Sequence, residues 1–496
     1  MKDRTMIIIG AGIGGLATGC YAQMNGYRSQ IFEMHSVPGG LCASWKRKGY
    51  TFDGCIHHLA GCLPESGLYP LWEELGAMPR PMLYARELVQ AEDPAGNCLT
   101  VFTDLDKLAQ HLTALAPEDA KTIDELVRGA KRLRGFDAIE LAAASPLDIL
   151  KALPILVPGL KWMKMTMAEA AQDLQNPFLR RVFPSLQYDS PTNPVATFLN
   201  LLAQCERRNW GWPKGGSLPF AQDIAQRYLD LGGQIHYRAK VERVLVEGDR
   251  AVGVRLADAS GGLEHRADVI VSSAYGAATV LDLLAGSYMN ERLRARYAVP
   301  VDEIGMGLLV DLGVDRDLSQ EPHALIQCLE QPVTIAGREY DRLYILLFGL
   351  DPSMAPPGKG VLKVELATSY SYWRDLYRDR ERYDAEKQQV AEAVIDQLEP
   401  RFPGLKAQIE VIDVATPMTT ERYTGNGQTF QGEVELDLAG MLTGKGNVRT
   451  LPGLAGFYMV GQSAGFPGLP SVAATGRDLV RYLCKQDKRR FVPQRS

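Results

Sequence analysis

Residues 7–33 read IIIGAGIGGLATGCYAQMNGYRSQIFE, and two interpretations fit them. A charged start followed by an apolar, small-residue run ending at Cys20 has the outline of an export signal. The same letters place Gly10, Gly12 and Gly15 in a G-x-G-x-x-G pattern, which is typical of a nucleotide-binding turn. The fold of the chain depends on which interpretation is right.

The segments around the glycines favour the nucleotide-binding turn. Residues 6–9 are apolar and β-branched and predict a buried strand, and a helix is expected up to Asn25-Gly26. A second strand over 29–32 then delivers Glu33, about 20 residues after the glycines, where a carboxylate can accept hydrogen bonds from the hydroxyls of a ribose. An export signal gives no reason for an acid there, so we predict that this stretch binds a dinucleotide.

Composition narrows the class of protein. The chain has 496 residues, 46% hydrophobic and 23% charged, with a formal net charge of −5, and it has no basic block. These values predict a soluble globular protein of two or more folding units that does not bind nucleic acid. Its 8 cysteines show no CxxC pair, which indicates buried thiols in a reducing, cytoplasmic setting. His57-His58 has no partner cluster at metal-ligand spacing, so no metal site is expected.

Two further segments are expected to approach the same dinucleotide. VPGGLCAS (37–44) places the doublet Gly39-Gly40 soon after the acid, where a second close backbone approach to the cofactor is possible, although a surface turn would also use it. Near the C-terminus, a strand over 456–460 ends at Gly461-Gln462, and a glycine-proline turn leads into a helix of small residues. The N–H groups at the start of that helix could stabilise negative charge on a reduced flavin, or the helix could simply pack on the sheet.

Five stretches resemble the phytoene desaturase, carotenoid isomerase and retinol saturase family: GAGIGGLA, FEMHSVPGGLCASWKRKGYTFDG, WPKGGSLPFAQDIA, TPMTTERYTGN and FYMVGQSAGFPGLPSVAATGRD. The resemblance implies FAD as cofactor and the following binding residues: Gly10, Gly12, Ile13, Gly14, Gly15, Glu33, Met34, Gly39, Gly40, Leu41, Val241, Ala274, Gly461, Gln462, Leu469, Pro470 and Val472. The chain departs from the family at Gln462, where many relatives carry an acid that binds the ribityl chain. Glutamine can still form hydrogen bonds there.

The resemblance also implies an α/β fold of the amine oxidase and phytoene desaturase type. A Rossmann-like FAD-binding domain is expected from residues 1–66, 196–286 and 436–496. An interleaved α+β substrate-binding domain is expected from 67–195 and 287–435. The chain has no second G-x-G-x-x-G motif, so a separate nicotinamide-binding domain is not expected. Electrons would then be exchanged with oxygen, a quinone or a soluble carrier.

The most apolar part of the expected substrate domain is PLDILKALPILVPGLKWMKM, residues 146–165. It is interrupted by Lys151, Pro154, Pro158 and Lys161, so it does not predict a spanning helix. Lysines beside Trp162 suit a segment that lies in the membrane interface, and a helix pair over the core explains them equally well. Peripheral membrane contact of a cytoplasmic protein is therefore one of two hypotheses.

Three residues are candidates for catalysis. His57 and His58 follow the glycine doublet in a segment that, in similar proteins, runs along the flavin toward the substrate, and imidazole suits acid–base work near neutral pH. One of them could instead cap the backbone while the other contacts FAD. Tyr423, in TERYTGN, could face the flavin.

Taken together, these features predict an FAD-dependent oxidoreductase that acts on carbon–carbon bonds of a hydrophobic, polyene or isoprenoid-like molecule by desaturation, saturation or cis–trans isomerisation. An amine or other small-molecule oxidase on the same scaffold is the alternative enzyme. A prenyl-lipid carrier without flavin is the alternative outside enzymes. The substrate class is what the family resemblance implies, because a fold alone does not fix function.

Overall fold

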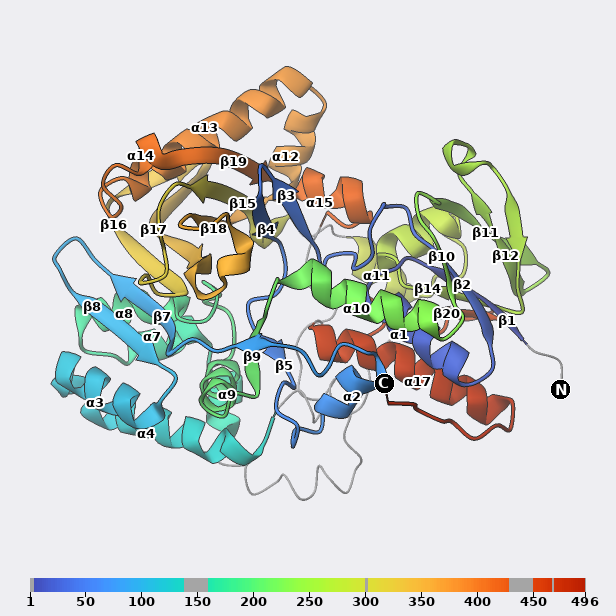
Figure 1. The fold of residues 1–496 in the computed structure, drawn as a ribbon, viewed down its shortest axis with the longest axis horizontal. Coiled ribbons are helices and arrows are strands. Elements are labelled where there is room, and N and C mark those ends of the chain that lie inside the picture. The colour runs from blue at the N-terminus through green and yellow to red at the C-terminus, as the bar shows by residue number, and fades with distance from the viewer. Residues whose placement is uncertain (1–3, 138–158, 299–301, 428–448, 466–467, 496) are drawn as a thin grey trace.

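A computed structural model describes residues 4–137, 159–298, 302–427, 449–465 and 468–495. The described chain is built around two large sheets, a parallel one and a mixed one, which lie at opposite ends of the molecule (Figure 1). A third, three-stranded sheet covers the outer side of the parallel sheet, and two small sheets connect the halves.

The parallel sheet has the strand order β10-β2-β1-β14-β20, and every neighbouring pair is parallel. Its central strand, β1, lies between β2 and β14. Ile8 pairs with Ile31 on one side and with Val271, from a distant part of the chain, on the other. The strands are β1 (Thr5–Ile9), β2 (Arg28–Phe32), β10 (Gln234–His236), β14 (Val269–Ser272) and β20 (Phe457–Met459). This arrangement confirms the predicted Rossmann-like domain.

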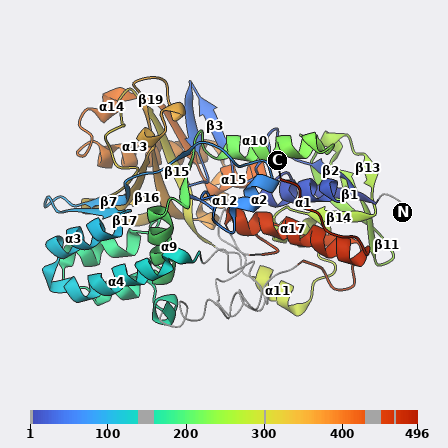
Figure 2. The same cartoon turned by 60° about the horizontal axis from the view of Figure 1, so that its bottom comes forward.

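Three helices pack side by side next to this sheet, and both cartoons show α17 along α1 (Figures 1 and 2). They are α1 (Ile13–Met24), α10 (Ser217–Asp230) and α17 (Leu469–Gln486). Small residues let the helices approach closely, since a Cβ added at Gly476 of α17 would lie 2.7 Å from the backbone nitrogen of Thr18 in α1. Helix α1 is buried along almost its whole length, as expected for the central helix of the domain.

The mixed sheet has seven strands in the order β19-β15-β18-β17-β16-β7-β8. All of its pairs are antiparallel except β16 with β7. Strand β18 lies inside the sheet and is buried on both faces over most of its length. The strands are β7 (Glu87–Glu92), β8 (Cys98–Phe102), β15 (Glu303–Val314), β16 (Ala324–Ile335), β17 (Arg338–Leu347), β18 (Gly360–Ser369) and β19 (Ile409–Ala415).

The remaining elements cover these sheets or connect them. The three-stranded sheet consists of β11 (Val241–Glu247), β12 (Arg250–Leu256) and β13 (Glu264–Arg266). The small strands are β3 (Ser44–Arg47), β4 (Tyr50–Asp53), β5 (Leu59–Ala60), β6 (Met82–Leu83) and β9 (Trp210–Pro213). The other helices are α2 (Tyr69–Glu74), α3 (Leu105–Leu115), α4 (Ala120–Arg132), α7 (Met167–Gln172), α8 (Pro177–Val182), α9 (Val195–Glu206), α11 (Glu291–Ala298), α12 (Tyr370–Tyr377), α13 (Arg380–Leu398), α14 (Leu405–Gln408) and α15 (Pro417–Thr424).

The strands of the parallel sheet all come from residues 1–66, 196–286 and 436–496, and those of the mixed sheet from 67–195 and 287–435. The division into two domains stays a prediction.

Residues 146–158 of the proposed membrane segment lie outside the described residues. Within the described part of the chain, none of the helices has the length and apolar character that crossing a bilayer requires. The eight cysteines are free, and most are buried, but Cys98 is exposed, contrary to the expectation of buried thiols.

The packing of the first turn predicts the effect of one substitution. A Cβ at Gly15 would lie 2.1 Å from the carbonyl oxygen of Gly10, which is backbone and cannot move aside. We expect Gly15→Ala to lower the free energy of unfolding by about 3 kcal/mol or more, measured by urea denaturation. The control is Gly135→Ala, where a Cβ meets no atom within 4 Å and should cost little. Equal stability of the two variants would contradict this account.

Candidate functional site

Three glycine-containing turns meet at the carboxyl edge of the parallel sheet. Gly12, at the start of α1, forms a bridge with Gly39, and a Cβ on Gly40 would lie 3.2 Å from the Cα of Gly12. A Cβ on Gly14 would lie 2.9 Å from the Cα of Gly461, which follows β20. The sequence predicted each turn separately, and the structure brings them together. Backbone N–H groups at the start of a helix, free of covering side chains, form a cradle suited to a pyrophosphate.

Glu33 lies at the end of β2 beside this cradle. Its Oε2 accepts a hydrogen bond from the backbone N–H of Ala11 at 2.7 Å, and its Oε1 accepts one from His35 at 2.7 Å. Burial raises the pKa of this carboxyl, although the two backbone hydrogen bonds oppose the shift. The side chain is therefore positioned next to the turn that it was predicted to serve.

The other predicted cofactor residues surround the same edge. Val241 begins β11 and packs in a cluster with Ile9 and Phe32, and a Cβ on Gly10 would lie 3.7 Å from the backbone nitrogen of Ala274. Ile13 is buried at the start of α1, Leu41 follows the glycine doublet, and Met34 is half-buried next to Glu33. Gln462 follows Gly461, and Leu469, Pro470 and Val472 form the first turn of α17. Their contact with a nucleotide stays a prediction.

A short segment, residues 39–58, leads from the nucleotide cradle to a second site. It forms the hairpin of β3 and β4 and then reaches His57 and His58. At the end of β4, Asp53 accepts hydrogen bonds from the backbone N–H and the hydroxyl of Ser217 at 2.6 and 2.7 Å. Ser217 is the first residue of α10, so a buried carboxylate holds the hairpin against a helix N-terminus.

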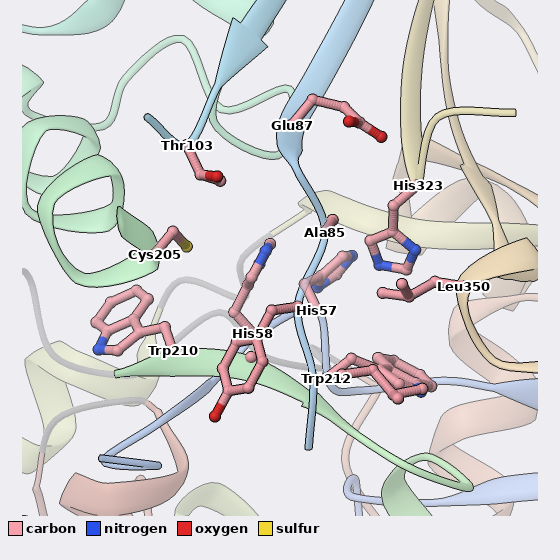
Figure 3. A pocket seen from close by; sticks show the side chains of 13 residues that line it. His57, His58, Ala85, Glu87, Thr103, Cys205, Trp210, Trp212, His323 and Leu350 are labelled. Atoms are coloured by element: carbon pink, nitrogen blue, oxygen red, sulfur yellow. The ribbon is translucent and has the colours of Figure 1, made fainter. Parts of the chain in front are cut away.

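The second site is a pocket that contains three histidines. His57, His58 and His323 line it together with Trp210 and Trp212 of β9, and Figure 3 shows the imidazole rings around the segment that carries Ala85. The ring centres of His58 and His323 are 6.4 Å apart. The free volume is about 10 Å³, so the surrounding side chains have to move before a molecule larger than water can enter.

His58 and His323 are neutral in this structure. Burial lowers the pKa of His58 to about 3, and the neighbouring histidines act in the same direction. Burial also lowers the pKa of His323 to about 4. The hydroxyl oxygen of Tyr188 lies 2.8 Å from Nδ1 of His58. The backbone of Tyr188 has a positive φ of 54°, which is rare outside glycine.

His57 is bound to a buried ion pair. Its Nε2 lies 2.9 Å from Oε2 and 3.1 Å from Oε1 of Glu365, and Nζ of Lys363 lies 2.6 Å from Oε1 of the same carboxylate. Burial acts to raise the pKa of Glu365, but the charges and hydrogen bonds of His57 and Lys363 outweigh it and hold the pKa well below its usual range. The carboxylate is therefore ionised.

Lys363 also contacts the hairpin and lies beside the neighbouring strand. Its Nζ donates a hydrogen bond to the carbonyl oxygen of Asp53 at 2.9 Å, and residue Lys363 pairs in register with Asp311 of β15. Asp311 is completely buried, and neither carboxylate oxygen has a hydrogen-bond partner among the described residues. Burial raises the pKa of Asp311 well above its usual value, so we assign a protonated, neutral side chain.

Tyr423 does not belong to this pocket. It lies on α15, is 39% exposed, and its ring packs edge-on against His35 at 4.8 Å. Because His35 is two residues after Glu33, the contacts of Tyr423 place it at the ribose end of the cradle. These contacts put Tyr423 near Glu33 rather than in the pocket with His57, and its predicted position facing the flavin and its role in catalysis stay predictions.

Sequence reasoning missed Glu365, Lys363, His323 and Tyr188. A signal for the first two was present, because GVLKVELATS places two charges at i and i+2 within an otherwise apolar strand. Charges on one face of a buried strand need partners or a function. The positions of His323 and Tyr188 gave no comparable pattern.

Comparisons with known proteins bear on the fold and the class of enzyme. The model of an NAD(P)-binding Rossmann-like domain matches residues 8–75. The chain is 27% identical to the chloroplastic prolycopene isomerase of Arabidopsis thaliana, covering 94% of this chain and 80% of the relative. It is 26% identical to a lycopene-forming phytoene desaturase of a Paracoccus species, covering 94% and 95%. It is 23% identical to the all-trans-retinol 13,14-reductase of Danio rerio, covering 85% and 76%.

Solved structures share the fold. An oxidoreductase from Methanosarcina mazei superposes with a TM-score of 0.60 at 16% identity, covering 96% of this chain and all of that one. Cyclohexylamine oxidase from Brevibacterium oxydans gives a TM-score of 0.57 at 17% identity, covering 98% and 100%. The family resemblance, the Rossmann-like fold and the enzyme class expected from the sequence are confirmed.

Asp311 and Asp351 are both buried, but the pKa of Asp311 is raised and that of Asp351 is lowered, so they predict opposite pH effects on stability. In the unfolded chain an aspartate releases its proton near pH 4, whereas folded Asp311 keeps its proton at higher pH. The contribution of Asp311 to the free energy of unfolding of the wild type therefore falls as pH rises above about 4. Asparagine does not titrate. We expect the stability of Asp311→Asn relative to wild type to increase with pH, by up to about 1.4 kcal/mol per unit, in urea denaturation from pH 4 to 7.

Asp351 is the matched control. Burial acts to raise its pKa, but hydrogen bonds from Ser353, Gly215 and Trp212 lower it overall, so its stabilisation is present at neutral pH and is lost on acidification. We expect Asp351→Asn to be less stable than wild type at pH 7, with the difference shrinking toward pH 3. The same sign for both variants would refute the assigned protonation states.

Proposed function

We propose that this enzyme, homologous over most of its length to carotenoid desaturases, carotenoid isomerases and a retinol reductase, is an FAD-dependent oxidoreductase acting on carbon–carbon bonds of a hydrophobic, polyene or isoprenoid-like substrate. The reaction is desaturation, saturation or cis–trans isomerisation. The observation that carries the proposal is the segment 39–58, which joins the glycine cradle to the histidine pocket through a single hairpin.

The residues at the cradle fit FAD. Glycine backbone from three segments meets without intervening side chains at the start of α1, where a pyrophosphate would bind, and Glu33 lies beside it for the ribose hydroxyls. Gln462, which follows Gly461, would take the place of the acid that the family resemblance implies there. When bound, FAD supplies two-electron redox chemistry by accepting or donating hydride.

The pocket supplies proton transfer and excludes water. His57 is the candidate acid–base group, because the Glu365 carboxylate stabilises the imidazolium that forms when the ring takes up a proton. Neutral His58 and the indoles of Trp210 and Trp212 give the pocket apolar walls that suit a hydrocarbon chain. Desaturation would use His57 as base, and saturation would use it as acid.

One experiment tests the function directly. The purified protein is denatured, and everything released is identified by mass spectrometry. A second, intact sample, oxidised or reduced, is incubated anaerobically with prolycopene, phytoene, all-trans-retinol or a panel of primary amines. FAD together with conversion of one compound is the expected result. Lipid without FAD, even after reconstitution, would indicate a carrier, and conversion of amines alone would indicate an amine oxidase.

Glu33 offers a test of the cradle. We expect Glu33→Ala to weaken FAD binding about 10- to 100-fold, because hydrogen bonds to a charged group contribute about 1.5–3 kcal/mol. Titration of the apoprotein with FAD, followed by flavin fluorescence, measures the change. Glu264→Ala, an exposed acid on β13, is the control. Unchanged affinity in Glu33→Ala would remove Glu33 from the binding site.

His57 offers a test of the pocket. We expect His57→Gln to retain FAD and to lower turnover about 10²–10⁴-fold, the usual contribution of a general acid or base. His111→Gln is the control, since His111 accepts a hydrogen bond from the backbone N–H of Thr100 and is not among the residues that line the pocket. Full activity of His57→Gln would show that the reaction does not depend on proton transfer by this residue.

A further inference from the structure

The buried strand β18 carries a charge pair that the fold alone does not require. Lys363 and Glu365 are 2% and 4% exposed and lie on the same face of the strand, with the apolar Val364 between them. Exchanging a buried ion pair for apolar residues of similar volume is often neutral or stabilising. A pair that persists in the centre of a sheet, with one member on a pocket histidine, therefore suggests a functional role.

The geometry divides the Glu365 carboxylate between two donors. Nζ of Lys363 is closest to Oε1, at 2.6 Å, and Nε2 of His57 is closest to Oε2, at 2.9 Å. A carboxylate can only accept hydrogen bonds, so Nε2 of His57 has to carry a proton. Among the described residues, Nδ1 of His57 has no hydrogen-bond partner.

We propose that Glu365 and Lys363 are positioning residues, which fix His57 in the tautomer with its proton on Nε2 and so make Nδ1 the atom that exchanges a proton with the substrate. The inference rests on the proposed function, because it assigns the proton-transfer atom of that same site. The proton moves between a substrate carbon and Nδ1, while Nε2 keeps its own proton. In desaturation the electron pair of the cleaved C–H bond becomes the new C=C π bond, and the hydrogen on the adjacent carbon leaves as hydride, for which FAD would be the acceptor; saturation is the reverse.

Lys363 anchors the carboxylate rather than acting on the substrate. It is tied on one side to the carbonyl oxygen of Asp53, in the hairpin that comes from the nucleotide cradle, and on the other to Glu365. Across the sheet, Tyr344 of β17 pairs in register with Glu365, and Asp311 pairs with Lys363. The neighbours of His57 in the pocket are Tyr188, at 4.8 Å between ring centres, and His58. Among these contacts, only the Glu365 carboxylate is bonded to His57.

A pair of substitutions separates this role from a structural one. The ammonium group of Lys363 can only donate hydrogen bonds. In Glu365→Gln it therefore bonds to the amide oxygen, which leaves the amide NH₂ group facing Nε2 of His57. Nε2 must then accept a hydrogen bond, and the proton moves to Nδ1. In the double variant Lys363→Met with Glu365→Gln, the amide oxygen is free to turn toward His57, and the Nε2–H tautomer returns.

The experiment reads the tautomer of His57 in the purified holoprotein by ¹⁵N NMR of labelled histidine, with the signal assigned by its loss in His57→Gln. We expect Nε2–H in wild type, Nδ1–H in Glu365→Gln, and Nε2–H again in the double variant. Turnover of the converted polyene should fall about 10- to 100-fold in Glu365→Gln, chiefly in kcat, and recover substantially in Glu365→Asp. Glu339→Gln, an exposed acid on β17, is the charge control.

An unchanged Nε2–H signal and unchanged kcat in Glu365→Gln would overturn the inference, whatever its effect on thermal stability. The NMR result does not depend on the identity of the cofactor or substrate. A protein that shows the tautomer change but contains no FAD would support the positioning role and overturn the proposed function. A flavoprotein that converts the polyene without the tautomer change would do the reverse.

Discussion

The first turn of the chain depends on backbone atoms that lie closer together than any side chain would permit. Gly15 contacts the carbonyl of Gly10, Gly14 contacts Gly461, and Gly40 contacts Gly12. These contacts connect residues from the beginning and the end of the chain at one edge of a parallel sheet. The place of α1 against α17 and the direction of the hairpin that leaves Gly40 both follow from this close approach.

The nucleotide half of the fold was predictable because its signals are local. Strand, glycine turn, helix, strand and acid follow one another within residues 6–33, and the structure has β1, α1 and β2 in that order. The mixed sheet was not predictable in the same way, because its strand order depends on pairing between distant segments. Its existence was inferred from resemblance, and its register came only from the structure.

The residues of the candidate site also fall into those that local sequence could identify and those that only pairing between distant segments reveals. His57 and His58 were identified because they follow the glycine doublet in the sequence, whereas Glu365 and Lys363 lie on a strand more than 300 residues away. Tyr423 was expected to face the flavin because of its place in TERYTGN, and the structure adds that its ring packs against His35. Spacing along the chain can locate a turn, but it cannot show which buried charges meet across a sheet.

The separation of 308 residues between His57 and Glu365 has a consequence for folding. Contacts between distant segments form late, because the entropy of closing a long loop has to be overcome before the contact contributes stability. The nucleotide turn can assemble from neighbouring residues, while the histidine pocket requires most of the chain to be in place. Newly made protein can therefore form the β1–α1–β2 turn first, and a chain ending before β18 would contain this turn without a competent pocket. The cradle itself is completed late as well, because it also needs Gly461 and α17.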